Sequence, residues 1–248
     1  MARRLLPLLL LVLLAAPASA AGADKLPLRP AGDRSPLGDE RLSNETTLTR
    51  WAHTNLIGTI RSKPTKRSTA LGKLRWNTED GYPEVYVVLQ SRLDRSERAW
   101  LQIRIPGRPN GRKGWVREEF LSNLKTIQTQ LTVDRRRLKA TLRKDGRRIW
   151  TSRIGVGQAG TPTPRGRFWI RERLKNLGGS PIYGPWAFGT AAYSRLSDWP
   201  GGGVIGIHGT NQPSLIPGRP SHGCIRVPNW NITRLAKLMP VGTPVRIR

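Results

Sequence analysis

The chain contains a single cysteine, Cys224, and two of its three histidines lie near it in the sequence. His222 belongs to the run SHGCIR, residues 221–226, and His208 lies sixteen positions before the cysteine. Cysteine attacks as a thiolate, and a neighbouring imidazole is the usual group that generates the thiolate near neutral pH. The types and spacing of these residues therefore predict a cysteine active site.

The N-terminus indicates where this thiol works. Arg3 and Arg4 precede an apolar run from Leu5 to Ala16, and small residues follow up to Ala20. This order is typical of a secretory signal peptide, cleaved here after Ala20. The apolar run is shorter than the roughly 20 residues that a membrane-spanning helix needs. We therefore expect export to the cell wall or periplasm, with an uncleaved N-terminal anchor as the alternative.

Export makes a lone cysteine informative. Exported proteins meet oxidising surroundings, in which paired cysteines form disulfides. Cys224 has no partner within the chain, so it is a buried inert residue, an intermolecular link or a reactive thiol. The neighbouring His222 and Gly223 are not typical of a hydrophobic core, which favours the interpretation of Cys224 as a reactive thiol.

The chain carries a formal net charge of +27. Such a charge often indicates a nucleic-acid partner, but the basic residues are scattered and form no DNA- or RNA-binding motif. For an exported protein, anionic wall polymers or membrane surfaces are the expected acidic partners, and nucleic acid is not expected. An arginine-rich solvated surface without a partner is the plain alternative.

Composition divides the mature chain into three parts. Residues 21–50 are rich in proline, glycine and charged residues, which predicts a flexible linker. Residues 51–124 read as short strands separated by turns, which predicts a small β-barrel, and residues 125–248 read as a second β-rich domain. The first domain's expected strands are Asn55–Ile60, Glu84–Gln90, Ala99–Ile105 and Gly114–Val116.

The second domain has further local signals. Asp145-Gly146 between two alternating segments predicts a two-residue hairpin turn. Apolar residues on one face predict a short helix at Asn231–Met239, ended by Pro240. Strands are expected at Val204–His208 and Val241–Ile247. The fold class predicted is mainly β, with one short helix.

These residues carry two resemblances. Residues 125–248 resemble the L,D-transpeptidase catalytic domain of bacterial cell-wall enzymes, whose signature is a histidine, a spacer, then Ser/Thr-His-Gly-Cys. Here that pattern is His208 followed by Ser221 to Cys224, with the family's upstream segment at Gly160–Phe168. More weakly, short pieces of residues 51–124 around Ile60, Trp100 and Trp115 resemble a bacterial SH3-like domain, which would bind wall peptides or act as a spacer.

The first resemblance implies roles for individual residues. Cys224 would be the nucleophile and His208 its general base, oriented by the backbone carbonyl of Gly209. Ser221, His222 and Gly223 would support the cysteine loop or an oxyanion hole. Arg226, which stands where many relatives carry asparagine, would bind substrate together with Thr210 and Asn211. No metal or cofactor is expected.

The resemblance also implies the reaction. The thiolate would attack the bond between diaminopimelate and the terminal D-Ala of a peptidoglycan tetrapeptide stem, releasing D-Ala. An amine of a neighbouring stem would take the thioester and form a 3→3 cross-link, whereas water would make the enzyme an L,D-carboxypeptidase. Acylation by carbapenems is a further expectation of this family.

Two other interpretations stay open. His208, His222 and Cys224 could be the ligands of a catalytic zinc ion, although their spacing matches no familiar zinc motif. The chain could also be a non-catalytic wall-binding protein that uses its SH3-like domain and its positive charge. A pure binder, however, has no need of a reactive thiol.

Overall fold

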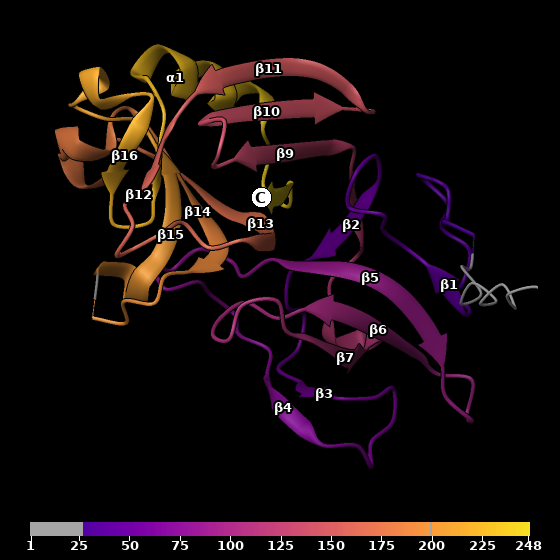
Figure 1. Ribbon diagram of the computed structural model, residues 1–248. Coiled ribbons are helices and arrows are strands. Elements are labelled where there is room, and N and C mark those ends of the chain that lie inside the picture. The colour runs from indigo at the N-terminus through magenta and orange to yellow at the C-terminus, as the bar shows by residue number, and fades with distance from the viewer. Residues whose placement is uncertain (1–26, 199) are drawn as a thin grey trace, which may run out of the picture.

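The computed structural model describes residues 27–198 and 200–248. These residues form two β-sheets and one α-helix, so the prediction of a mainly β fold is confirmed (Figure 1). The predicted signal peptide, residues 1–20, and the first residues of the predicted linker lie outside the described residues. Within the described part, no helix has the length and apolar character required to cross a membrane.

The first sheet contains the N-terminal strands. Its order is β4-β3-β7-β6-β5-β2-β8, with β1 paired to β5, and neighbouring strands are antiparallel. The strands are β1 (Glu40–Arg41), β2 (Thr49–Ala52), β3 (Thr59–Arg61), β4 (Ala70–Lys73), β5 (Tyr86–Leu93), β6 (Ala99–Arg104), β7 (Lys113–Arg117) and β8 (Lys125–Ile127), with a 3-10 turn, η1, at Glu118–Phe120.

The second sheet follows in the order β11-β10-β9-β18-β13-β14-β15-β17-β12-β16. Its strands are β9 (Thr129–Asp134), β10 (Lys139–Lys144), β11 (Arg147–Arg153), β12 (Gly155–Gly157), β13 (Gly166–Lys175), β14 (Trp186–Tyr193), β15 (Val204–His208), β16 (Gly218–Ser221), β17 (Ile225–Arg226) and β18 (Pro244–Ile247). The helix α1 (Asn229–Leu238) buries Ile232, Leu235 and Ala236. Short 3-10 turns lie at Leu177–Gly179, Pro181–Tyr183, Pro200–Gly203 and Pro213–Leu215.

The prediction of a flexible linker is wrong for its described part. Strand β1 pairs with β5, and the backbone N–H of Leu42 donates to the carbonyl of Leu89 at 2.9 Å. Leu42 is fully buried in the N-terminal core. Prolines and glycines do occur here, but β1 adds a strand beside β5, and Leu42 and Leu37 pack into the N-terminal core. Composition averaged over the segment concealed that contribution.

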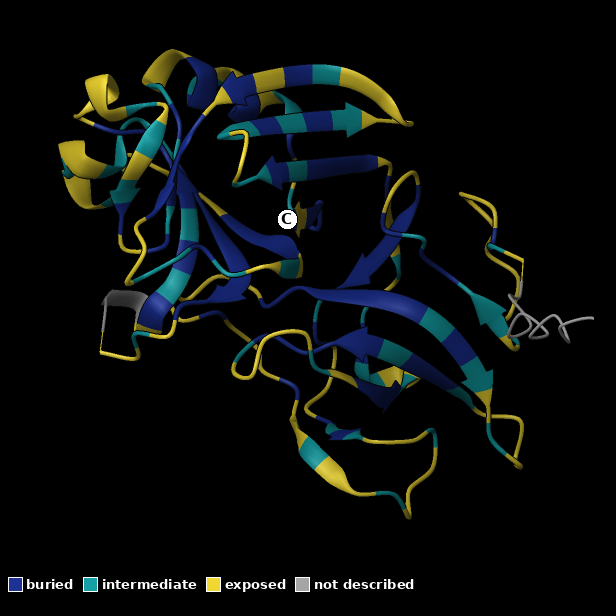
Figure 2. Ribbon diagram, in the orientation of Figure 1, coloured by how far each residue is buried: buried dark blue, intermediate teal, exposed yellow. Residues whose placement is uncertain are grey.

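The boundary between the two β-rich parts also differs slightly from the prediction. Strand β8 pairs with β2, so the first sheet extends to Ile127. Trp51 and Val85 from this sheet belong to the same hydrophobic cluster as Leu131 and Phe168 from the second. The two sheets therefore share a continuous core (Figure 2). The SH3-like character of the first part stays a prediction.

Most local signals located the right elements. Strands β6, β7 and β15 and helix α1 lie within two residues of their predicted bounds. The hairpin turn at Asp145-Gly146 joins β10 and β11, with positive φ at both residues. The predicted strand Asn55–Ile60 is wrong for its first part, because residues 55–58 form a bend before β3 begins. There the N–H groups of Asn55 and Leu56 both donate to the carbonyl of Phe120.

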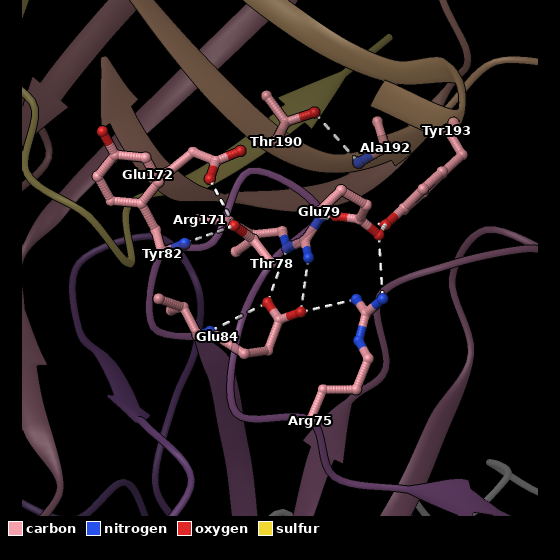
Figure 3. Close-up of polar contacts among 12 residues, drawn as sticks. Arg75, Thr78, Glu79, Tyr82, Glu84, Arg171, Glu172, Thr190, Ala192 and Tyr193 are labelled. Carbon is pink, nitrogen blue, oxygen red and sulfur yellow. Dashed lines mark hydrogen bonds and ion pairs between the residues drawn. The ribbon is translucent and has the colours of Figure 1, made fainter. Parts of the chain in front are cut away.

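Polar contacts join the two sheets beside the shared core. Trp169 donates its indole N–H to the carbonyl of Val85 at 2.7 Å. Arg171 of β13 donates to both carboxylate oxygens of Glu84, at 2.7 and 2.5 Å, and both side chains are fully buried (Figure 3). Arg108, from the connection between β6 and β7, also joins the two sheets by donating to backbone carbonyls in the connection between β14 and β15.

Candidate active site

Adjacent strands bring the cysteine and the histidine together. His208 ends β15, and Cys224 directly precedes β17, which pairs in parallel with β15. Gly206 lies two residues before His208 and so faces the same side of the sheet. Its N–H donates to the Cys224 Sγ at 3.3 Å. A Cβ built on Gly206 would lie 3.6 Å from the His208 ring and 3.8 Å from Sγ, so the two side chains flank this glycine.

The imidazole of His208 is fixed by its surroundings. Its side chain is buried, and its Nδ1 lies 2.6 Å from the carbonyl oxygen of Gly209. A carbonyl only accepts, so Nδ1 carries the proton and Nε2 is left as the basic nitrogen. The Tyr183 ring packs edge-on against the imidazole, with centroids 5.1 Å apart. This arrangement places Gly209 where the family resemblance expects the orienting carbonyl.

Burial sets the protonation of both groups. Burial raises the pKa of the Cys224 thiol, which the Gly206 N–H and the Arg226 charge offset only in part. The pKa of His208 is lowered to about 4, chiefly by burial and also by the positive charge of Arg226, although the Gly209 carbonyl opposes both effects. At neutral pH the resting pair is therefore a neutral thiol beside a neutral imidazole. This differs from the thiolate that the sequence argument expects.

Alkylation of Cys224 tests this resting state. Because burial raises the pKa of this thiol above its ordinary value, little thiolate is present at pH 7, and iodoacetamide is expected to react slowly there. The rate should rise about tenfold per pH unit between about pH 6 and 9. The alkylation rate at each pH is measured by quenching the reaction at a series of times and recording the intact mass of the protein. A rate that is already constant below about pH 8 would instead indicate a thiolate–imidazolium pair and would contradict the neutral resting state.

The cysteine loop is held by its own residues. Ser221 Oγ donates to the carbonyl of Cys224 at 2.6 Å and accepts from the N–H of Gly223 at 3.2 Å. Thr163 Oγ1 donates to the carbonyl of Gly223 at 2.7 Å. Gly223 has φ of +129°, and a Cβ there would lie 2.7 Å from Ile205 Cδ1. Ser221 therefore satisfies loop backbone, and position 223 requires glycine.

A groove opens on the cysteine and the histidine, with a cavity of about 210 Å³. Of the residues predicted from the sequence, it is lined by His208, Ser221, His222, Cys224 and Arg226. The remaining predicted residues, Gly209, Thr210, Asn211 and Gly223, are not among its lining residues.

The predicted substrate-binding residues separate accordingly. Arg226 lines the groove and donates to Gln212 at 2.9 Å. Thr210 is buried, accepts from the Gln212 N–H and donates its own N–H to Asn229, so it shapes the loop. Asn211 is exposed outside the groove lining. Only the arginine is placed to touch a bound substrate.

The described residues contain no group of three or more His, Cys, Asp or Glu side chains that could hold a metal ion. His208, His222 and Cys224 therefore do not form the zinc site that their sequence spacing left open. His222 is exposed at the edge of the groove.

The groove is also lined by residues that were not predicted from the sequence as parts of the site, among them Gly206, Tyr183 and Asp80. Gly206 could have been found, because it alternates with His208 along a predicted strand. Tyr183 lies in a 3-10 turn with no local signal. Asp80 comes from the N-terminal sheet's connection between β4 and β5, and only the tertiary fold brings it into the groove.

Known proteins similar to this chain belong to one family. A family described as "YkuD: L,D-transpeptidase catalytic domain" matches residues 128–247. The putative L,D-transpeptidase YkuD of Bacillus licheniformis is 38% identical over 127 residues, 51% of this chain and 70% of the relative. Its counterpart from Bacillus subtilis is 38% identical over 122 residues, 49% of this chain and 67% of the relative.

Among solved structures, a cysteine-to-serine variant of an L,D-transpeptidase from Enterococcus faecium is 26% identical, with a TM-score of 0.40. The match covers 49% of this chain and 50% of that one, so the chain spans about half of the solved protein.

Proposed function

The chain belongs to the L,D-transpeptidase family of cell-wall peptidoglycan enzymes, and from this premise we propose that it is an exported transpeptidase that forms 3→3 cross-links through a thioester on Cys224. The observation that carries the proposal is the arrangement around Gly206. The Cys224 sulfur accepts from the N–H of this glycine, and the His208 imidazole lies against the same residue. The histidine, in turn, is held with Nε2 as its basic nitrogen.

The first half-reaction is acyl transfer to the enzyme. The Cys224 Sγ attacks the carbonyl that joins diaminopimelate to the terminal D-Ala, and His208 Nε2 takes the thiol proton. A neutral thiol and a neutral imidazole are the starting states that this step needs. As the C–N bond breaks, the imidazolium returns the proton to the departing D-Ala amine. A thioester remains on the cysteine.

The second half-reaction consumes the thioester. The amine of an acceptor stem gives a proton to His208 Nε2 and attacks the thioester carbonyl. The C–S bond then breaks, the new amide forms, and the sulfur regains its proton from the imidazolium. Water in place of the amine gives a free carboxylate, which is L,D-carboxypeptidase activity.

The developing oxyanion needs a donor in both half-reactions. The N–H of Gly223 already donates to Ser221. We therefore assign the oxyanion contact to the N–H of Cys224, at the start of β17. His222, at the groove edge, supports the same side of the site, and Arg226 binds a carboxylate of the stem.

The remaining parts of the chain fit work in the cell wall. Residues 1–20 have the order of a signal peptide, which supports export. Residues 51–124 would be an SH3-like domain for wall peptides or a spacer, with residues 125–248 as the catalytic domain. The net charge of +27 would hold the protein near anionic wall polymers.

Acylation by a carbapenem tests the proposal. Intact mass followed by peptide mapping is expected to show one stoichiometric adduct on the peptide that contains Cys224. Tetrapeptide stems are then supplied, and mass spectrometry is expected to detect D-Ala release together with 3→3 dimers. The Cys224→Ala variant is the control and should give neither adduct nor product.

Other outcomes are equally informative. D-Ala release without dimers would make the enzyme an L,D-carboxypeptidase. No adduct and no product, with retained binding to purified sacculi, would leave a non-catalytic wall-binding protein as the better account. Activity lost with EDTA but not with iodoacetamide would overturn the thiol mechanism.

A further inference from the structure

A carboxyl group from the N-terminal part of the chain reaches the groove that contains the catalytic pair. Asp80 lies in the connection between β4 and β5 and lines the same groove as Cys224 and His208. Beneath it, Glu172 of β13 is only 2% exposed, and its Oε2 accepts from Thr78 Oγ1 at 2.7 Å (Figure 3). The two carboxyl groups are close enough to affect each other's charge.

Strand pairing fixes the direction in which Glu172 faces. Glu172 pairs with Gly189 on β14, and Gly189 pairs with Gly206 on β15. Directly paired residues place their side chains on the same side of a sheet. Glu172 therefore faces the side that carries His208 and Cys224. Because neighbouring strands lie about 4.8 Å apart, the Glu172 and Gly206 backbones are separated by about 10 Å.

Two glycines form the floor between these groups. A Cβ on Gly189 would lie 2.1 Å from Glu172 Oε1, so the carboxyl group extends over Gly189 toward the catalytic pair. On Gly206 the side chains nearest to such a Cβ are the His208 ring, at 3.6 Å, and the Cys224 sulfur, at 3.8 Å, with the backbone oxygen of Phe188 at 3.7 Å. The groove thus has no side chain rising from its floor between the carboxyl group and the sulfur. A small substrate group has room there.

The groove carries charges of opposite sign near Cys224 and near Glu172. Arg226 lies at the cysteine end, whereas Asp80 is the acidic residue among the described residues that line the groove. The pKa of Glu172 is raised to about 7, chiefly by burial and also by the neighbouring Asp80, while Thr78 and Arg171 act against them. Gly189, packed against the carboxyl group from β14, contributes no charge. A compact cation at this point would relieve both the burial cost and the repulsion.

We propose that Asp80 and Glu172 together bind the primary ammonium group of the acceptor stem, that Glu172 takes one proton from it, and that the neutral amine left there resolves the Cys224 thioester in place of water. The inference rests on the proposed function and names its acceptor specificity. Half of the amine site then comes from each β-rich part of the chain. The N-terminal part is accordingly a component of the substrate site.

Competition between two nucleophiles for one thioester tests this inference. The enzyme is acylated by a tetrapeptide stem and offered an acceptor stem, whose amine is cationic, together with hydroxylamine, which is uncharged at about pH 8. The ratio of cross-linked dimer to hydroxamate is read by mass spectrometry. Because both products come from one acyl-enzyme, any change in the rate of acylation cancels in the ratio.

In Asp80→Asn the ratio of dimer to hydroxamate is expected to fall at least about tenfold, since a charge-assisted contact to the ammonium is lost. Asp145→Asn removes the same charge at the exposed β10–β11 turn and should keep the wild-type ratio. An unchanged ratio in Asp80→Asn would overturn the inference. Hydroxamate without dimer in the wild type would also overturn it, whereas no acyl-enzyme at all would overturn the proposed function instead.

The role of Glu172, the buried carboxyl group of the pair, is tested by the pH dependence of the acceptor KM. In the wild type the acceptor KM is expected to rise as the pH falls through about 7, because Glu172 takes up a proton and loses its attraction for the ammonium. Glu172→Gln keeps an acceptor for Thr78 and should raise the KM at about pH 8 while flattening this dependence. A pH dependence of KM that is identical in the wild type and in Glu172→Gln would contradict the assignment.

Discussion

Replacing Cys224 by alanine is expected to lower the turnover of tetrapeptide stems by about four orders of magnitude or more. The variant lacks the only side chain that can form the thioester, and no covalent intermediate can replace it. His208→Gln should cost about 10²- to 10⁴-fold, because the thiol then has no base to take its proton. Both rates are measured as D-Ala release under single-turnover conditions.

The two losses should not add. Once the nucleophile is absent, the base has no proton to accept, so the double variant is expected to match Cys224→Ala alone. His222→Gln serves as the matched comparison, since His222 lies at the exposed edge of the same groove and is expected to cost far less than His208→Gln. Equal rate losses for His208→Gln and His222→Gln would contradict the assignment of His208 as the general base. Thermal melting of each variant separates lost chemistry from lost folding.

The proposed catalytic pair, which the structure brings together, could be predicted from the sequence because its signal is local. Cys224, His222 and Ser221 lie within four residues, and His208 ends a strand with clear alternation. The hairpin at Asp145 likewise depends on two adjacent residues and was found. Motifs of this kind can be recognised in a single sequence because their residues are adjacent in the chain and depend on local backbone geometry.

The rest of the groove could not be found in this way. Asp80 and Glu172 are 92 positions apart in the chain and meet only because the β4–β5 connection packs against β13. Thr210 and Asn211 show the converse difference: the family resemblance implied contact with substrate, but Thr210 is buried and Asn211 lies outside the groove lining. Burial also reversed the expected protonation of Cys224, and a sequence carries no measure of burial.

Arg171→Met is expected to destabilise the protein by about 3 to 5 kcal/mol, the usual cost of removing one partner of a buried ion pair. The guanidinium donates to both oxygens of Glu84, and both side chains are fully buried between the two sheets. Its loss leaves Glu84 with the half-exposed Arg75 as its cationic partner. For a chain of this size the melting temperature should fall by about 6 to 20 °C, as measured by circular dichroism or calorimetry.

The physical cause of the stability lost in Arg171→Met predicts a second substitution that restores part of it. If the penalty is a buried carboxylate without a full partner, then Glu84→Leu added to Arg171→Met should recover part of the lost stability, because the uncompensated charge is gone. Arg92→Met is the matched control: its ion pair with Asp39 is longer, at 3.8 Å, and partly exposed, so its loss should cost under about 1 kcal/mol. A double variant less stable than Arg171→Met would instead show that Glu84 stabilises the interface through its other contacts, with Arg75 and with the N–H of Val85.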